Sequence, residues 1–323
     1  MKHKNERLSD ARQSFDLLSA VLFINAVLTY LLIVLGSTVR VTNSGTGCPS
    51  WPLCYGKATP IFGNSHALIE QSHRYLASVV SILVFISLIL VYRLKDKARK
   101  HFLIKIAYIA VGEIIVQVIL GAVTVITKNA PWTVFAHLLI ASIFLGTMIV
   151  YFLASHSLDC KWYFPKKPIK TVAYLSLIFT FLTITFGSLI VNGDAEQNCN
   201  SWPLCPTGEP TKDVVLNLIH RTVVGLTVLF YLVFAYIGTK YYKRTSWWIK
   251  SIALLICVIV ITAVFGAISA LTKAQPVFQD IHLSLAALDW VVVVTLVAQT
   301  HLKYHRNLQI ENIEESNQIF VSS

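Results

Sequence analysis

Eight uninterrupted apolar runs, each long enough to cross a lipid bilayer, constrain the fold of this chain more than any other feature. They fall near residues 17–38, 70–92, 104–127, 132–155, 171–192, 215–238, 250–272 and 280–300. A transmembrane helix needs about 20 apolar residues, and continuous rather than alternating runs exclude a transmembrane β-barrel. The segments between the runs are too short for a globular domain of about 50 residues. The sequence therefore predicts an all-α integral membrane protein with eight transmembrane helices.

The distribution of basic residues predicts the orientation of these helices. The 323 residues carry a net charge of +11, which in a soluble protein would point to nucleic acid. Here Lys and Arg concentrate in alternate short loops and at both ends, so we expect no nucleic-acid partner and a lipid bilayer as the surroundings. Basic residues stay on the cytoplasmic side of a membrane. We therefore expect a multi-pass protein of the cell membrane with both termini cytoplasmic and residues 301–323 as a cytoplasmic tail.

The chain contains two copies of one unit. Residues 36–54 read GSTVRVTNSGTGCPSWPLC, and residues 187–205 read GSLIVNGDAEQNCNSWPLC, at an offset of 151 without a gap. Each copy holds four helices, an even number, so both copies insert with the same orientation and form a parallel repeat. The sequence therefore predicts two pseudo-symmetric four-helix bundles, over residues 17–155 and 171–300.

Four histidines recur at equivalent places in the repeat, within about the first two turns of the even-numbered helices and toward the outer face. They are His73, His137, His220 and His282. Two imidazoles that face each other inside a four-helix bundle suit a six-coordinate haem iron, so each half is expected to hold one haem. The alternative for any single histidine is an interfacial hydrogen bond, and zinc would require more ligands than each half offers. The remaining histidines are expected in solvated loops or tails: His3, His66, His101, His156, His301 and His305.

Arg74 and Arg221 directly follow two of these histidines. A guanidinium can bind a carboxylate through two parallel hydrogen bonds, and haem carries two propionates. Both arginines are therefore candidates for propionate binding. The alternative is an interfacial anchor whose charged end reaches toward water.

Two cysteine pairs lie on the outer side of the membrane. Cys48 and Cys54 bracket PSWPL, whereas Cys199 and Cys205 bracket NSWPL. Such spacing in an oxidising compartment predicts a disulfide across each loop, and it matches neither a zinc ribbon nor a thioredoxin-like motif. We interpret the second pair as a structural staple. For the first pair, a staple and a role in redox chemistry or haem handling both remain open.

The two halves differ at a telling position. Glu70 lies three residues before His73 on the same helix face, whereas the second half has Asn217 at this place. A carboxylate beside a haem can accept a proton during oxidation of a bound group, and an amide cannot. The alternative is that Glu70 caps the N-terminus of its helix. Glu113 and Asp289 are further acids inside spans, for which proton transfer and helix packing both remain open.

Together these features resemble the haem A synthase family, in the bacterial form with two outer-loop cysteine pairs. The resemblance covers nearly the whole chain: the eight spans, the duplicated halves, the four histidines, GCPSWPLC, NCNSWPLC and Glu-x-x-His-Arg at 70–74. It implies an oxidoreductase acting on a CH group, which oxidises the C8 methyl group of haem O to a formyl group and so makes haem A. It also implies haem B as a resident cofactor that passes electrons out.

The resemblance assigns roles to individual residues. It implies that His73 and His137 bind the iron of the substrate haem, that His220 and His282 bind haem B, and that Glu70 is the catalytic carboxylate. The Cys48–Cys54 loop is implicated in haem handling. A haem O synthase is the implied partner. The electron acceptor in the membrane is not identified, a quinone is one candidate, and a homo-oligomer is compatible with this scheme.

Two other functions compete with the synthase. A dihaem membrane cytochrome that carries electrons without modifying haem needs all four histidines, but it has no need of Glu70. A haem transporter would typically have helices broken near the middle of the membrane, and the spans show no paired Gly or Pro interruption. The asymmetry at Glu70 therefore favours the enzyme.

Overall fold

A computed structural model of the protein describes residues 2–59, 62–156, 161–162, 167–192, 199–205, 211–242 and 245–303. Its helices are α1 (Lys2–Val41), α2 (Ser65–Tyr92), α3 (Lys97–Ile126), α4 (Pro131–Ser155), α5 (Lys167–Asn192), α6 (Lys212–Tyr241), α7 (Ser246–Leu271) and α8 (Pro276–His301). A short 3-10 helix (Ser44–Thr46) follows α1, and β1 (Lys161–Trp162) pairs antiparallel with β2 (Leu302–Lys303). In the described part of the chain, eight helices are long and apolar enough to cross a membrane. The prediction of an all-α membrane protein is confirmed.

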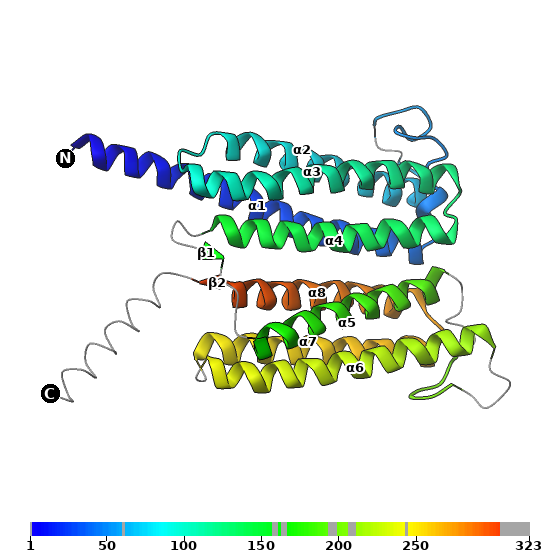
Figure 1. Ribbon diagram of the computed structural model, residues 1–323. Coiled ribbons are helices and arrows are strands. Elements are labelled where there is room, and N and C mark those ends of the chain that lie inside the picture. Colours follow the sequence, from blue (N-terminus) through cyan, green and yellow to red (C-terminus); the bar gives the residue numbers. More distant parts are fainter. Residues whose placement is uncertain are drawn as a thin grey trace.

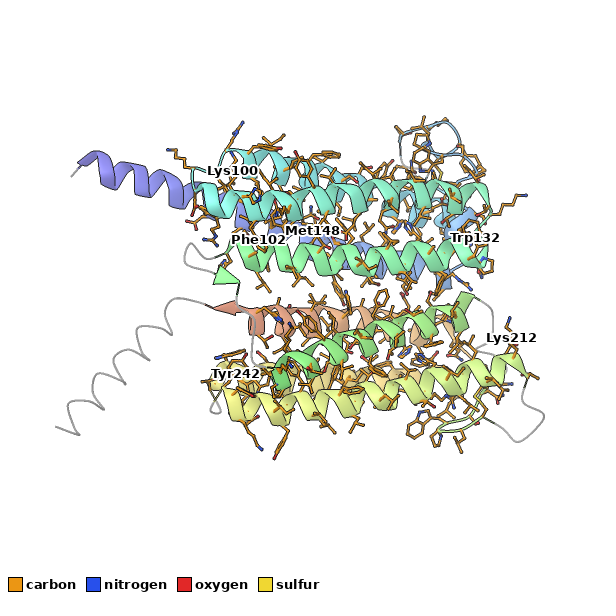
Figure 2. All side chains as sticks on the ribbon, viewed as in Figure 1. Lys100, Phe102, Trp132, Met148, Lys212 and Tyr242 are labelled. Carbon is orange, nitrogen blue, oxygen red and sulfur yellow. A yellow bond between two sulfur atoms is a disulfide. The ribbon has the colours of Figure 1, made fainter. Side chains whose placement is uncertain are left out.

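The helices form two groups that lie side by side. Helices α1–α4 make up one group and α5–α8 the other, with α4 and α8 next to each other in the middle (Figure 1). The loops that follow α1 and α5 lie at one end of the molecule, and α1 begins at the opposite end. Trp132 and Lys212 mark the loop end in Figure 2, whereas Lys100 and Tyr242 lie toward the other end.

Hydrogen bonds between α8 and the helices of the N-terminal group join the two groups. Trp290 of α8 donates its indole N–H to the backbone carbonyl of Ser142 in α4 at 2.7 Å, and its ring packs against Gly146. Near the loop end, the Asp280 carboxylate accepts hydrogen bonds from two residues of α1, Ser37 at 2.5 Å and Thr38 at 2.9 Å. In a membrane, such contacts rather than the hydrophobic effect hold helices together.

Helices α2 and α6 begin earlier than the apolar runs predict. Asn64 accepts a hydrogen bond from the backbone N–H of Ala67, and Thr211 does the same for Val214, so each caps a helix N-terminus. The first turns are polar, and hydropathy alone therefore misses them. As a result, the ligand candidates of α2 and α6 lie in the third turn of their helices. The predicted placement in the first two turns holds only for α4 and α8.

Three of the histidines expected in solvent have protein partners instead. The Nδ1 of His156 lies 3.3 Å from the hydroxyl of Ser19. His301 is buried at the end of α8, where its Nε2 lies 3.0 Å from the hydroxyl of Tyr174 in α5. The Nδ1 of His66 lies 3.0 Å from the hydroxyl of Ser44. The prediction of a solvated position was therefore wrong for His301, because α8 includes this residue and packs it against Tyr174 of α5. Residues 304–323, most of the expected tail, lie outside the described residues.

Candidate functional site

Each of the four ligand candidates packs its imidazole against a glycine of the preceding helix. A Cβ atom added at the glycine would lie within 4 Å of the imidazole Cε1 in every pair. The pairs and distances are Gly36–His73 at 3.1 Å, Gly121–His137 at 3.6 Å, Gly187–His220 at 3.1 Å and Gly266–His282 at 2.8 Å. The repeat thus builds the same cradle four times, and in each one the missing side chain makes room for the ring.

The hydrogen-bonding state of the imidazoles fits metal ligation. The Nδ1 atom of His282 lies 2.9 Å from the backbone carbonyl of Thr262 in α7. A carbonyl can only accept, so Nδ1 carries the proton and the Nε2 lone pair is available to a metal. Metal-ligating histidines typically donate their other ring N–H in this way.

The other three imidazoles have a buried Nδ1 without a hydrogen-bond partner in the structure. The ring of His73 lies near the carbonyl of Leu32, and that of His220 lies near the carbonyl of Thr183, without reaching hydrogen-bond geometry. Each of these carbonyls comes four residues before the cradle glycine, as Thr262 does in α7. A buried unpaired nitrogen is costly, so these three rings are held less firmly than the ring of His282.

The two ligand candidates of each half lie near one another. His73 and His137 lie close enough to interact electrostatically, and so do His220 and His282. In the described part of the chain, no three His, Cys, Asp or Glu side chains gather as a site for a metal ion. Two imidazoles without a third protein ligand are what a haem iron requires, because the porphyrin supplies the remaining ligands. The residues of both halves therefore fit a haem.

Both expected disulfides are present. Cys48 bonds to Cys54 and Cys199 bonds to Cys205, each closing a sequence separation of 6. Both sulfur atoms of the first bridge are in buried residues, packed against Ala67 of α2. The first loop therefore sits directly on the start of the helix that carries the first ligand candidate.

Arginines next to the histidines bind these loops. The guanidinium of Arg74 donates to the carbonyls of Ser50 at 2.7 Å and Cys48 at 3.2 Å. Arg221 binds its own loop in a similar way, through the carbonyls of Pro203 at 2.8 Å and Cys199 at 3.3 Å. Each guanidinium thus fastens a disulfide loop to the helix below it. Neither propionate binding nor snorkelling alone, the two roles considered from the sequence, predicts this contact.

Glu70 also forms a hydrogen bond to the first disulfide loop. Its Oε2 accepts the backbone N–H of Cys48 at 2.7 Å, and its Oε1 accepts Nη2 of Arg74 at 2.5 Å. The residue is buried, and Asn64 caps the helix, so the alternative of Glu70 as an N-terminal cap was wrong. In the second half, Asn217 donates to the carbonyl of Asp213 in its own helix. At this position the first half therefore has a carboxylate bound to its loop, whereas the second half has an amide bound within its own helix.

The remaining acids inside the spans have separate surroundings. Glu113 of α3 accepts a hydrogen bond from Thr147 of α4 at 3.0 Å. Gln117, one turn further along α3, donates to the backbone carbonyl of His137 at 2.9 Å. Asp289 lies in the other half, next to Tyr231 of α6. The structure therefore does not bring these acids together with Glu70.

The sequence reasoning missed the glycine cradles. All four glycines lie inside the stretches that match between the two halves, so the repeat itself marked them. Their role could not be inferred, because nothing in the sequence shows which helix faces contact each other.

Comparisons with known proteins agree with this architecture. Residues 19–294 match the family described as cytochrome oxidase assembly protein. A protein of Exiguobacterium sibiricum named haem A synthase is 27% identical over 219 residues, which cover 67% of this chain and 73% of that protein. A Staphylococcus aureus (strain JH9) protein of the same name is 28% identical over 272 residues, covering 76% of this chain and 83% of its own. The chain therefore belongs to the cytochrome oxidase assembly protein family, which is the family of the haem A synthases.

Proposed function

We propose that this protein is a haem A synthase that oxidises the C8 methyl group of haem O to a formyl group. The relatives named haem A synthase support this activity. The observation that carries the proposal is the asymmetry of the repeat. Both halves hold a pair of cradled histidines, but the Glu70 carboxylate that binds the Cys48 N–H in the first half is replaced by the amide of Asn217 in the second.

The two halves bind different haems. The bundle over residues 17–155 binds haem O as substrate, with His73 and His137 as ligands of its iron. The bundle over residues 171–300 holds haem B between His220 and His282. When bound, haem B supplies a one-electron acceptor that passes electrons to a membrane carrier such as a quinone.

Glu70 accepts the proton that leaves the substrate. Conversion of a methyl to a formyl group takes one oxygen atom from water and releases four electrons and four protons, so a base must stand beside the reacting carbon. The hydrogen bonds from Cys48 and Arg74 hold the carboxylate in a fixed direction, and they leave lone pairs on both oxygens for an incoming proton. Because Glu70 and His73 lie on one face of α2, the base lies beside the position of the substrate iron ligand.

Arg74 and Arg221 act as positioning residues for the loops. A propionate would have to displace the loop carbonyls that each guanidinium now binds. We therefore place both arginines in loop attachment, and the propionate role predicted from the sequence would depend on release of these contacts.

The location of the sites follows from the charge distribution. We propose that the protein crosses the cell membrane with both termini cytoplasmic and both haem sites toward the outer face. A haem O synthase in the same membrane would supply the substrate.

Mass spectrometry of extracted haems tests the proposal. The full chain is expressed with and without a haem O synthase, and the haems of the purified protein are identified. Hydroxylated haem O or haem A should appear only when haem O is supplied. Haem B together with unmodified haem O would instead favour the dihaem electron carrier, and well-folded protein without haem would contradict both functions.

A further inference from the structure

A chain of hydrogen bonds crosses the interior of the C-terminal half. Asp289 is buried in the middle of α8, and its Oδ2 lies 2.8 Å from the hydroxyl of Tyr231 in α6. That hydroxyl lies 2.7 Å from Oγ1 of Thr180 in α5, which in turn lies 2.6 Å from the backbone carbonyl of Ser176. Tyr231 and Thr180 are buried as well. Three helices thus contribute to one continuous polar chain with an acid at its end.

The hydrogen-bond chain lies further along α6 and α8 than the ligand candidates His220 and His282, on the same helix faces. Asp289 follows His282 by seven residues, which places it on the same face of α8, about 10 Å further along the helix axis. Tyr231 follows His220 by eleven residues, again close to a whole number of turns. The acid therefore points into the bundle interior that holds the two histidines, without contacting either.

The number of hydrogen atoms available to the hydrogen-bond chain favours a protonated, neutral Asp289. If Asp289 is protonated, it donates to Tyr231, Tyr231 donates to Thr180, and Thr180 donates to the Ser176 carbonyl. Each hydroxyl group then donates its one hydrogen to the next acceptor along the hydrogen-bond chain. If Asp289 is ionised, Tyr231 must donate toward it and the direction reverses. A negative charge then remains in the membrane, with Oδ1 lacking any partner.

No cation balances that charge in the described part of the chain. No Lys, Arg or His side chain there forms an ion pair with Asp289. The titratable groups on elements around α8 are Tyr231, Tyr30 of α1, which donates to the Ser284 carbonyl, and Tyr174 of α5, which pairs with His301 at the far end. Further titratable groups on α8 and the helices packed against it include Asp280 of α8, Tyr151 of α4, Cys257 of α7 and the cradled histidines. Of these groups, only Tyr231 contacts Asp289.

The N-terminal half lacks this chain. The position equivalent to Asp289 is Phe144, and the position equivalent to Tyr231 is Val84, both buried. Only Thr29, the counterpart of Thr180, is polar, and it donates within its own helix to the Asn25 carbonyl at 2.8 Å. A residue needed only to pack the bundle would have no reason to be an acid in one copy. The asymmetry indicates a task specific to the half that holds haem B.

We propose that Asp289 is a redox-linked proton site, protonated when the haem between His220 and His282 is reduced and ionised when that haem is oxidised. One electron arriving at the iron is matched by one proton from solvent arriving at Asp289. When the electron leaves for the membrane acceptor, the proton leaves as well. The inference rests on the proposed haem B site of the C-terminal half.

Electrostatics supplies the coupling. A ferric haem with two neutral imidazoles carries one positive charge on its core, and a ferrous haem carries none. At a separation of about two helical turns in a medium of low dielectric constant, that charge stabilises an ionised carboxylate. Its loss on reduction leaves the carboxylate without compensation, so Asp289 takes up a proton and the direction of the hydrogen-bond chain reverses.

Redox titration at several pH values tests the proposal. The full-length protein with haem B is titrated spectroscopically, and the midpoint potential of the C-terminal haem should fall with rising pH, approaching one proton per electron. In Asp289→Asn this dependence should disappear while the low-spin spectrum remains. In Tyr231→Phe the ionised acid loses its hydrogen-bond donor, so the pH-dependent window should move upward. Thr29→Val, at the counterpart of Thr180 in the other half, should behave like the wild type.

A redox-difference infrared spectrum provides the second readout. Reduction should produce the C=O band of a protonated carboxyl group in the wild type, and Asp289→Asn should lack this band. A potential independent of pH in the wild type, or a dependence unchanged in Asp289→Asn, would overturn the inference. Absence of any haem wave from the C-terminal half would instead contradict the proposed function.

Discussion

The carboxylate of Glu70 accepts the backbone N–H of Cys48 at 2.7 Å, and this bond ties the helix that carries His73 to the first disulfide loop. Arg74, one turn after Glu70, binds the same loop through its carbonyls. The Glu70 carboxylate, the Arg74 guanidinium and the first disulfide loop are thus joined by hydrogen bonds. Movement of the loop must therefore change the position or the hydrogen bonding of Glu70.

Substitution of Glu70 by glutamine should stop product formation while haem binding continues. The amide keeps the size of the side chain and retains an oxygen for the Cys48 N–H, but it cannot accept a proton from the substrate. Loss of a general base typically lowers the rate by about 10²- to 10⁴-fold. The measurement is mass spectrometry of haems extracted from Glu70→Gln in cells that supply haem O.

Glu113→Gln is the matched control, because Glu113 is also an acid inside a span of the first half but contacts Thr147 rather than the loop. It should continue to make product. Equal loss of product in both variants would assign the effect to the charge of the half as a whole and contradict a specific role of Glu70.

Alanine substitutions in the glycine cradles should weaken haem binding in the order of their contact distances. An added Cβ at Gly266 would lie 2.8 Å from Cε1 of His282, closer than atoms tolerate, so the imidazole must move away from its carbonyl. The equivalent Cβ at Gly121 would lie 3.6 Å from His137, which is ordinary contact. We expect Gly266→Ala to lose most of the low-spin signal of the C-terminal haem, and Gly121→Ala to keep both haems.

Absorption and electron paramagnetic resonance spectra of the purified variants give the readout. Gly187→Ala should fall between the two, because its Cβ would lie 3.1 Å from the ring of His220. An unchanged low-spin signal in Gly266→Ala would show that the glycine does not set the position of the imidazole.

The sequence predicted the helices well because a bilayer imposes a length and a hydropathy on every span. The repeat marked the four histidines as ligand candidates, and the structure places each of them in the same glycine cradle. Their binding of haem iron, and the role that the family resemblance gives to Glu70, stay predictions. The starts of α2 and α6 were missed because Asn64 and Thr211 cap polar first turns that hydropathy does not detect.

Contacts between distant segments could not be predicted. Nothing in the sequence shows that Arg74 points at the loop carbonyls, or that Tyr231 meets Asp289 across the bundle. Hydropathy gives the depth of a residue in the membrane, but not the helix that its side chain faces. That information depends on the packing of all the helices.

The two disulfides should differ in their effect on activity. The loops are equal in length, and the chain-entropy model gives each bridge a stabilisation of about 2 kcal/mol. Replacement of Cys199 and Cys205 together by serine should lower the free energy of unfolding by that amount and leave product formation in place. The same change at Cys48 and Cys54 should also lower product formation, because Glu70 loses its fixed partner.

Thermal unfolding in detergent and extracted-haem analysis of both double variants measure these effects. If the Cys199 and Cys205 variant loses as much product as the other, the loops act on the site only through stability. The staple interpretation of the second bridge would then apply to both bridges.

The junction between the halves should depend on Trp290. Trp290→Phe removes the indole N–H that binds the Ser142 carbonyl at 2.7 Å, and the ring contact with Gly146 becomes smaller. Hydrogen bonds between membrane helices contribute about 1 kcal/mol, so the free energy of unfolding should fall by roughly this amount. Trp132→Phe is the control, because Trp132 lies exposed at the loop end of α4 (Figure 2) and should leave stability unchanged. Equal stability of Trp290→Phe and the wild type in thermal unfolding would show that the remaining contacts between the halves hold them together without this bond.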